Sequence, residues 1–321
     1  MPAAARLRSS TLFAIACLAL ASGCARLPGA RLPGAGVTPL KPATLSELRE
    51  YVLNHKADVD QFSLRGPFEV ATHKDYELRL SASERIDADL YLSAPAEKAP
   101  LVILLHGHDN SKEDHAYQAL HLATWGMHSL AVQLPNKGPW VSNARTLAKI
   151  ASFIHRQPDL IDSRIDVNKI ILVGHSFGGA AVAIALAEGA PAAGGILLDP
   201  AGTGKDLPKF LRQIDKPVML LGADERVSPI RDRSYFYEYI RSGVAEISIR
   251  DASHEDAQFP LEPAPQGPGT DSSATEELQI TFVSALTAAA FSLGHTGNFD
   301  FAWTSLADAI ANGRFFDALK K

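Results

Sequence analysis

The chain has 321 residues, of which 46% are hydrophobic and 21% are charged, and its formal net charge is −5. This composition is typical of a globular protein with enough length for one large domain or two small ones. A weakly acidic chain without basic runs lacks the charge pattern of nucleic-acid-binding proteins, so no nucleic-acid partner is expected.

The first 23 residues have the pattern of a secretion signal. Arg6 and Arg8 precede an apolar run at 11–21, which is too short for a membrane-spanning helix with stop-transfer flanks. The segment that ends in Cys24, Ala-Ser-Gly-Cys, resembles the lipobox of bacterial lipoproteins, in which the cysteine is acylated. An ordinary cleaved signal of a secreted protein is the alternative. Because both cysteines lie within the first 24 residues, we expect no disulfide in the folded part.

A tether is predicted after Cys24, since the unit Arg-Leu-Pro-Gly-Ala occurs twice in succession without apolar periodicity. We therefore predict a signal peptide at 1–23, a lipid-anchored tether at 24–43 and one domain at 44–321. By resemblance to the sorting rule of Gram-negative bacteria, Ala25 after the cysteine permits delivery to the outer membrane. The expected location is the cell envelope, either periplasmic or on the outer membrane, with the lipid anchor as the contact to the membrane.

The domain is predicted to begin with a helix and three strands. Apolar residues spaced for one helical face place the start of the helix near Ser46. In the third strand, apolar residues alternate with Asp87, Asp89 and Tyr91, which predicts antiparallel pairing with one exposed face. The three strands are predicted at 68–72, 76–80 and 86–92.

From Leu101 onward, short apolar runs alternate with helical patterns, as in a mostly parallel sheet covered by helices on both faces. Together with the antiparallel strands before it, this pattern predicts an α/β fold with no second domain. Strands are predicted at 101–105, 127–132, 170–173, 195–198, 218–221 and 245–249. Helices are predicted at 144–154, 180–188, 228–240, 278–293 and 302–319.

The segment Gly174-His-Ser176-Phe-Gly178 stands between a buried strand and an alanine-rich helix. This is the context that a nucleophile elbow requires, in which a tight turn lifts the serine hydroxyl above the edge of the sheet. Glycines flank the serine because side chains there would crowd the neighbouring strand and helix. Ser176 is therefore the candidate nucleophile.

These residues resemble the α/β-hydrolase superfamily, since His106-Gly107 ends an early strand and an aspartate and a histidine follow Ser176 in chain order. Within the superfamily, the chain is similar to the dienelactone hydrolase, chlorophyllase and cutinase or polyester hydrolase branches, which have no cap. The resemblance implies the α/β-hydrolase fold. The stretch between Asp199 and Pro217 is too short for a helical lid, so no large cap is expected.

The resemblance implies a Ser-His-Asp triad around Ser176. His254 follows the last predicted parallel strand and is the expected general base. The expected acid is Asp224, which ends the strand at 218–221, where most of the superfamily carries it. Asp199, at the end of the preceding strand, is the alternative, and Glu225 is a weaker one.

The resemblance also implies an oxyanion hole. One donor is expected to be the backbone N–H of Phe177, and the other the N–H of His108 in the loop after the strand at 101–105. Trp140, expected on a loop at the same edge of the sheet, is the candidate substrate-binding residue, with a packed loop aromatic as the alternative.

A metal site is the rival interpretation of His106-Gly-His108-Asp109. A metallohydrolase of the β-lactamase fold needs His-x-His-x-Asp-His, and Asn110 and Ser111 occupy the last two positions here. We therefore expect neither a metal nor a cofactor. The predicted function is a serine hydrolase that cleaves small or polymeric carboxylic esters. An acyltransferase on the same scaffold and a non-catalytic envelope binding lipoprotein are the alternatives.

Overall fold

The computed structural model describes residues 44–202, 204–224, 233–241, 243–261 and 272–321. The predicted signal peptide, the tether and Cys24 lie outside these ranges, as do Glu225 and most of the proline-rich segment after His254.

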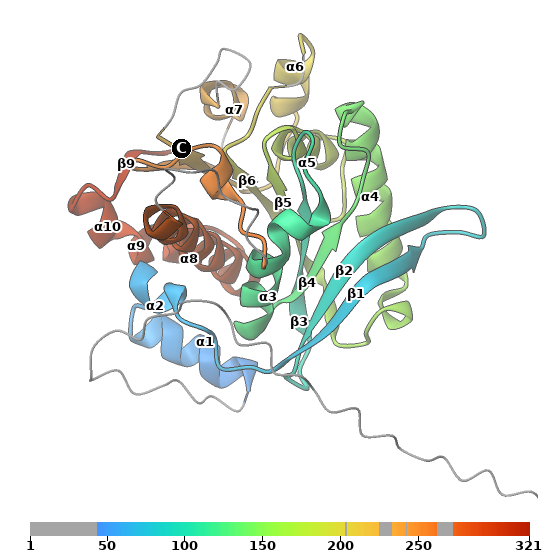
Figure 1. Ribbon diagram of the computed structural model, residues 1–321, viewed down its shortest axis with the longest axis horizontal. Coiled ribbons are helices and arrows are strands. Elements are labelled where there is room, and N and C mark those ends of the chain that lie inside the picture. Colours follow the sequence, from blue (N-terminus) through green and yellow to red (C-terminus); the bar gives the residue numbers. More distant parts are fainter. Residues whose placement is uncertain (1–43, 203, 225–232, 242, 262–271) are drawn as a thin grey trace, which may run out of the picture. The chain divides into compact units, whose positions relative to one another are not determined.

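One nine-stranded sheet forms the centre of the fold, in the order β1-β2-β4-β3-β5-β6-β7-β8-β9 (Figure 1). The strands from β4 to β8 in this order pair in parallel, whereas β1, β2 and β9 pair antiparallel. The predicted α/β class, with a mostly parallel sheet and antiparallel strands before it, is confirmed. The strands are β1 (Val70–Arg79), β2 (Arg85–Ser93), β3 (Ala99–Leu105), β4 (His128–Val132), β5 (Ile165–His175), β6 (Gly194–Leu198), β7 (Val218–Ala223), β8 (Val244–Ile249) and β9 (Phe315–Lys320).

Helices cover both faces of this sheet (Figure 1). One face packs against α1 (Leu45–Asn54), α2 (Val59–Ser63), α3 (Ala116–Thr124), α8 (Ser272–Thr296), α9 (Asp300–Ser305) and α10 (Ala307–Ala311). The other face packs against α4 (Trp140–Arg156), α5 (Phe177–Ala187), α6 (Leu207–Leu211) and α7 (Ser234–Tyr239).

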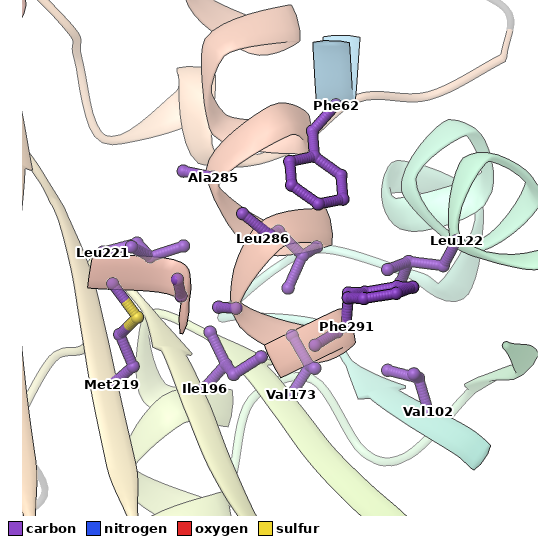
Figure 2. Packing of buried hydrophobic residues seen from close by; sticks show 14 of the residues in the cluster. Phe62, Val102, Leu122, Val173, Ile196, Met219, Leu221, Ala285, Leu286 and Phe291 are labelled. Carbon is purple, nitrogen blue, oxygen red and sulfur yellow. The ribbon is translucent and has the colours of Figure 1, made fainter. Parts of the chain in front are cut away.

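Successive residues of the central strands face opposite layers of helices. Val173 and Ile196 belong to the core beneath α8, where Leu286 and Phe291 pack over the sheet (Figure 2). Leu172 belongs to the core on the opposite face. Because both faces are covered, the central strands are apolar throughout and do not alternate with polar residues.

Helix α8 is long and apolar enough over Ala274–Thr296 to cross a membrane by those two criteria. However, 78% of its most apolar window is buried inside the protein, and its side chains fill the core shown in Figure 2. Its composition is therefore explained by packing against the sheet.

The N-terminal strands differ from the prediction in two respects. The segments expected at 68–72 and 76–80 form the single strand β1, which shifts register between His73 and Tyr76. The expected exposed face of β2 is present only at Asp87, since Asp89 is buried together with Tyr91. The Asp89 carboxylate lies 2.8 Å from the buried Lys112 ammonium, and this pairing offsets the cost of burying a charge.

The C-terminal helix predicted at 302–319 is also wrong. The chain forms the short helices α9 and α10 and then turns at Gly313, whose φ is +82°, into β9. Phe315 is buried at the start of β9 and pairs with Ile249 of β8. A parallel strand at the end of a sheet leaves backbone groups unpaired, and the pairing with β9 satisfies them. Of the helix expected at 228–240, the described part is α7.

Candidate active site

Ser176 occupies the sharp turn between β5 and α5. Its φ of 54° and ψ of −126° are strained for a residue with a side chain, and such conformations concentrate at functional sites. Two backbone hydrogen bonds fix the turn, because the Ser176 N–H donates to the Leu198 carbonyl at 3.0 Å and the Ala201 N–H donates to the Ser176 carbonyl at 3.0 Å. The predicted strand, turn and helix around this serine are therefore present.

Three glycines allow the turn to pack closely against its surroundings. A Cβ added to Gly174 would lie 2.3 Å from the Gly178 carbonyl oxygen, and one added to Gly178 would lie 2.3 Å from the His106 carbonyl oxygen. A Cβ added to Gly107 would lie 2.9 Å from the Ser176 Cβ. The loop after β3 thus touches the serine turn directly. His106-Gly107 and the turn around Ser176 are therefore neighbours, as the sequence predicts.

His254 and Asp199 are hydrogen-bonded to each other in the buried region beside this turn. The His254 Nδ1 lies 2.5 Å from the Asp199 Oδ2, and each residue is 3% exposed. Asp199 follows β6, the strand next to β5, and Leu198 at the end of β6 accepts the N–H of Ser176. Asp199 is therefore hydrogen-bonded to His254, and the residue before it is hydrogen-bonded to Ser176.

The structure corrects the preference for Asp224 as the partner of His254. The Asp224 carboxylate accepts the backbone N–H of Asp251 at 3.0 Å, and the Asp224 N–H donates to the Ala252 carbonyl at 2.9 Å. Asp224 is partly exposed and lines an open depression together with Asp251, Ala252 and Ser253. It is thus held by the loop before His254, while the imidazole reaches the aspartate of the neighbouring strand.

Arg233 is a further member of this cluster, and no sequence motif indicates it. Its Nη1 donates to the Asp199 Oδ1 at 3.1 Å, and the Ala223 N–H donates to the same oxygen at 3.0 Å. The arginine side chain is 8% exposed. An arginine just before a short helix has no distinctive sequence signal, and only the fold places it beside Asp199.

His175 is the residue between Gly174 and Ser176 in the turn. It is buried, its Nε2 lies 3.1 Å from the His254 carbonyl oxygen, and its ring centroid lies 4.5 Å from that of His254. The side chain therefore supports the loop that carries His254.

The two residues expected to supply oxyanion donors lie next to each other. Phe177 is the first residue of α5, where a backbone N–H has no acceptor within its own helix. The ring of His108 meets the ring of Phe177 edge-on, with centroids 6.0 Å apart. The N-terminus of a helix also favours negative charge, which suits an anion bound beside Phe177.

Trp140 lies in the first turn of α4, and the expectation that it would stand on a loop is wrong. Its ring stacks on that of Phe177, with centroids 5.5 Å apart and an interplanar angle of 16°. Trp140 is only 9% exposed, whereas Phe177 is partly exposed. Trp140 therefore packs behind the ring of Phe177 and supports it. Phe177 and His108 provide the accessible aromatic surface beside Ser176.

His106 is held by backbone groups in the interior of the protein. It is buried, and its ring nitrogens lie 2.9 Å from the carbonyl oxygens of Gly107 and Leu134. Burial lowers its pKa below the usual value. Within the described ranges, no three His, Cys, Asp or Glu side chains are arranged to hold a metal ion.

Comparison with known proteins agrees with this fold. Residues 102–275 match the model of the alpha/beta hydrolase family, and this segment is more than half of the chain. The protein is therefore a member of the alpha/beta hydrolase family. The matched segment contains Ser176, Asp199 and His254. No curated protein matches the chain.

Proposed function

We propose that the protein is a serine hydrolase that cleaves carboxylic esters with Ser176, His254 and Asp199. The observation that carries this proposal is the 2.5 Å contact between His254 and Asp199, both buried beside a serine in the conformation of a nucleophile elbow. In a serine hydrolase, a histidine oriented by a carboxylate takes the proton of the serine hydroxyl. The His254 ring lies against the ring of His175, the residue before Ser176, with centroids 4.5 Å apart.

In the proposed reaction, the Ser176 Oγ attacks the ester carbonyl and the Nε2 of His254 takes its proton. Asp199 accepts the Nδ1–H of His254, which keeps the other nitrogen free to act as a base. The N–H groups of Phe177 and His108 stabilise the oxyanion of the tetrahedral intermediate. The imidazolium then protonates the departing alcohol, which leaves the acyl group on Ser176. In the second half of the reaction, His254 takes a proton from water as the water attacks the acyl carbonyl. The bond to the Ser176 Oγ breaks, the imidazolium returns the proton to that oxygen, and the acid is released.

The segment between β6 and β7 supports an open site. Within residues 204–217, the described helical structure is α6, which has five residues. A helix of this length does not form a cap over the serine. We therefore propose small or polymeric esters as substrates, with the partly exposed ring of Phe177 contacting the group next to the ester carbonyl.

Labelling with a fluorophosphonate tests the proposed function. The wild type should be labelled and should hydrolyse p-nitrophenyl esters, whereas Ser176→Ala should do neither. Ser152→Ala, on the partly exposed side of α4, is the matched control and should retain both properties. A folded wild type that is neither labelled nor active on a panel of acyl chain lengths, polyesters and lipids would support the non-catalytic binding protein instead.

Acyl transfer is the second catalytic proposal, because the same acyl-enzyme can react with an alcohol. Product analysis with added alcohol acceptors separates the two activities, since a transferase forms the new ester in preference to the free acid. We also propose attachment to the envelope through Cys24. Incorporation of labelled palmitate by the wild type and its loss in Cys24→Ser would support the anchor, while equal labelling of both would refute it.

A further inference from the structure

Arg233 connects Asp199 to the neighbouring strand β8. Besides its contact with Asp199, its Nε donates to the Glu246 Oε1 at 3.2 Å and its Nη2 donates to the Ser248 Oγ. Glu246 and Ser248 are buried and lie two residues apart on the same face of β8. The guanidinium is thus held at three corners, and a planar group held in this way has one orientation.

Gly222 of β7 provides the space that the arginine occupies. A Cβ at this position would lie 2.2 Å from the Arg233 Nε and 2.4 Å from its Cζ. The arginine side chain therefore lies directly against the backbone of β7, between Asp199 after β6 and the two polar residues of β8. The absence of a side chain on Gly222 allows this close contact.

The hydrogen bonds leave the Asp199 carboxylate no freedom to rotate. One oxygen receives the N–H groups of Ala223 and Arg233, and the other receives the ring of His254. Arg233 is therefore one of the groups that hold the carboxylate that faces His254.

We propose that Arg233 is a positioning residue, which fixes Asp199 so that the carboxylate orients His254 for catalysis. The inference rests on the proposed function and assigns no contact between Arg233 and the substrate. The guanidinium acts through Asp199, so its loss should reduce the rate of the chemical step more than the binding of substrate.

The test compares Arg233→Gln and Arg233→Lys with Arg164→Gln. Arg164 pairs with Asp162 just before β5, at the opposite end of that strand from Ser176, and is the matched control. In Arg233→Gln, kcat should fall roughly 10- to 100-fold with KM within about twofold of the wild type. Arg233→Lys should recover part of the loss, because lysine keeps the charge but lacks the planar fork. Arg164→Gln should remain near the wild-type rate.

A spectroscopic readout accompanies the kinetics. The low-field proton resonance of the His254 Nδ1–H reports its bond to Asp199, and it should shift or broaden in Arg233→Gln while it stays unchanged in Arg164→Gln. A wild type without esterase activity would refute the proposed function, and the resonance would still test the role of Arg233. Wild-type kcat together with an unchanged resonance in Arg233→Gln would overturn the inference.

A second variant covers the case in which Arg233→Gln does not fold. Ser248→Ala removes one of the three anchors of Arg233 without changing the charge, and Ser248 does not take part in the bonds to Asp199 or His254. We expect kcat to fall about threefold, with a shifted resonance. If both quantities equal those of the wild type, the positioning role of Arg233 is refuted.

Discussion

Replacing Asp199 with asparagine should place His254 in the wrong tautomer. The Oδ1 of Asp199 accepts two donors, the N–H of Ala223 and the guanidinium of Arg233. An asparagine must direct its single oxygen toward these donors, so its NH₂ group would face the imidazole. The Nδ1 would then become an acceptor, and the proton would reside on Nε2. In this tautomer His254 has no lone pair with which to take the proton of Ser176.

The expected loss follows from this change of tautomer. In serine hydrolases, such a replacement lowers kcat by roughly 10⁴-fold while the rest of the site stays in place. This loss corresponds to about 5 kcal/mol of transition-state stabilisation. The matched variant is Asp224→Asn, in which the amide oxygen can still accept the N–H of Asp251. We expect kcat of this variant to stay within about threefold of the wild type.

Steady-state hydrolysis of a p-nitrophenyl ester measures both variants, and thermal unfolding shows whether each is folded. Asp199→Asn also removes the negative charge beside the buried Arg233, so some loss of stability is expected. A folded Asp199→Asn enzyme with near wild-type kcat would refute the role of Asp199 as the partner of His254. A large loss of kcat in Asp224→Asn in its place would refute that role equally.

Two further predictions concern stability and the serine turn. Burial lowers the pKa of His128 to about 4, so the unfolded chain binds a proton that the folded chain excludes as the pH falls below about 6.5. The His128 imidazole should therefore lower the free energy of unfolding by about 2 kcal/mol between pH 7 and pH 5. His128→Asn, which can still accept the Ser93 N–H, should flatten that part of the urea-unfolding profile, whereas the exposed control His155→Asn should not. In Gly178→Ala, the new Cβ would overlap the His106 carbonyl oxygen, so the rate of fluorophosphonate labelling should fall sharply. Labelling at the wild-type rate would contradict this close packing.

Much of the fold could be predicted because its signals are local. The apolar runs of β3 and β5 to β8 identify strands covered on both faces, and the antiparallel start of the sheet was also predicted. The errors arise where distant partners decide the outcome. Asp89 is buried because Lys112 reaches it from another part of the chain, and β9 forms because β8 offers an unpaired edge. Neither partner can be identified from the local pattern.

The candidate site shows the same division. The serine turn and its contact with Gly107 follow from a short motif in a clear strand-and-helix context. The identity of the aspartate cannot be predicted from a motif, since Asp199 and Asp224 both follow parallel strands at the same edge of the sheet. Their positions in the sequence are equally suitable, and the choice depends on which side chain reaches His254.

A group of residues outside the serine motif explains why the structure favours Asp199. On β8, the polar residues Glu246 and Ser248 lie on the same face of the strand, and both are buried. Arg233 donates to both of them and to Asp199, and it can do so because Gly222 carries no side chain. Each of these residues has an ordinary explanation when it is considered alone. Together they form a buried support that orients the carboxylate after β6, whereas the carboxylate after β7 is used by the loop that leads to His254.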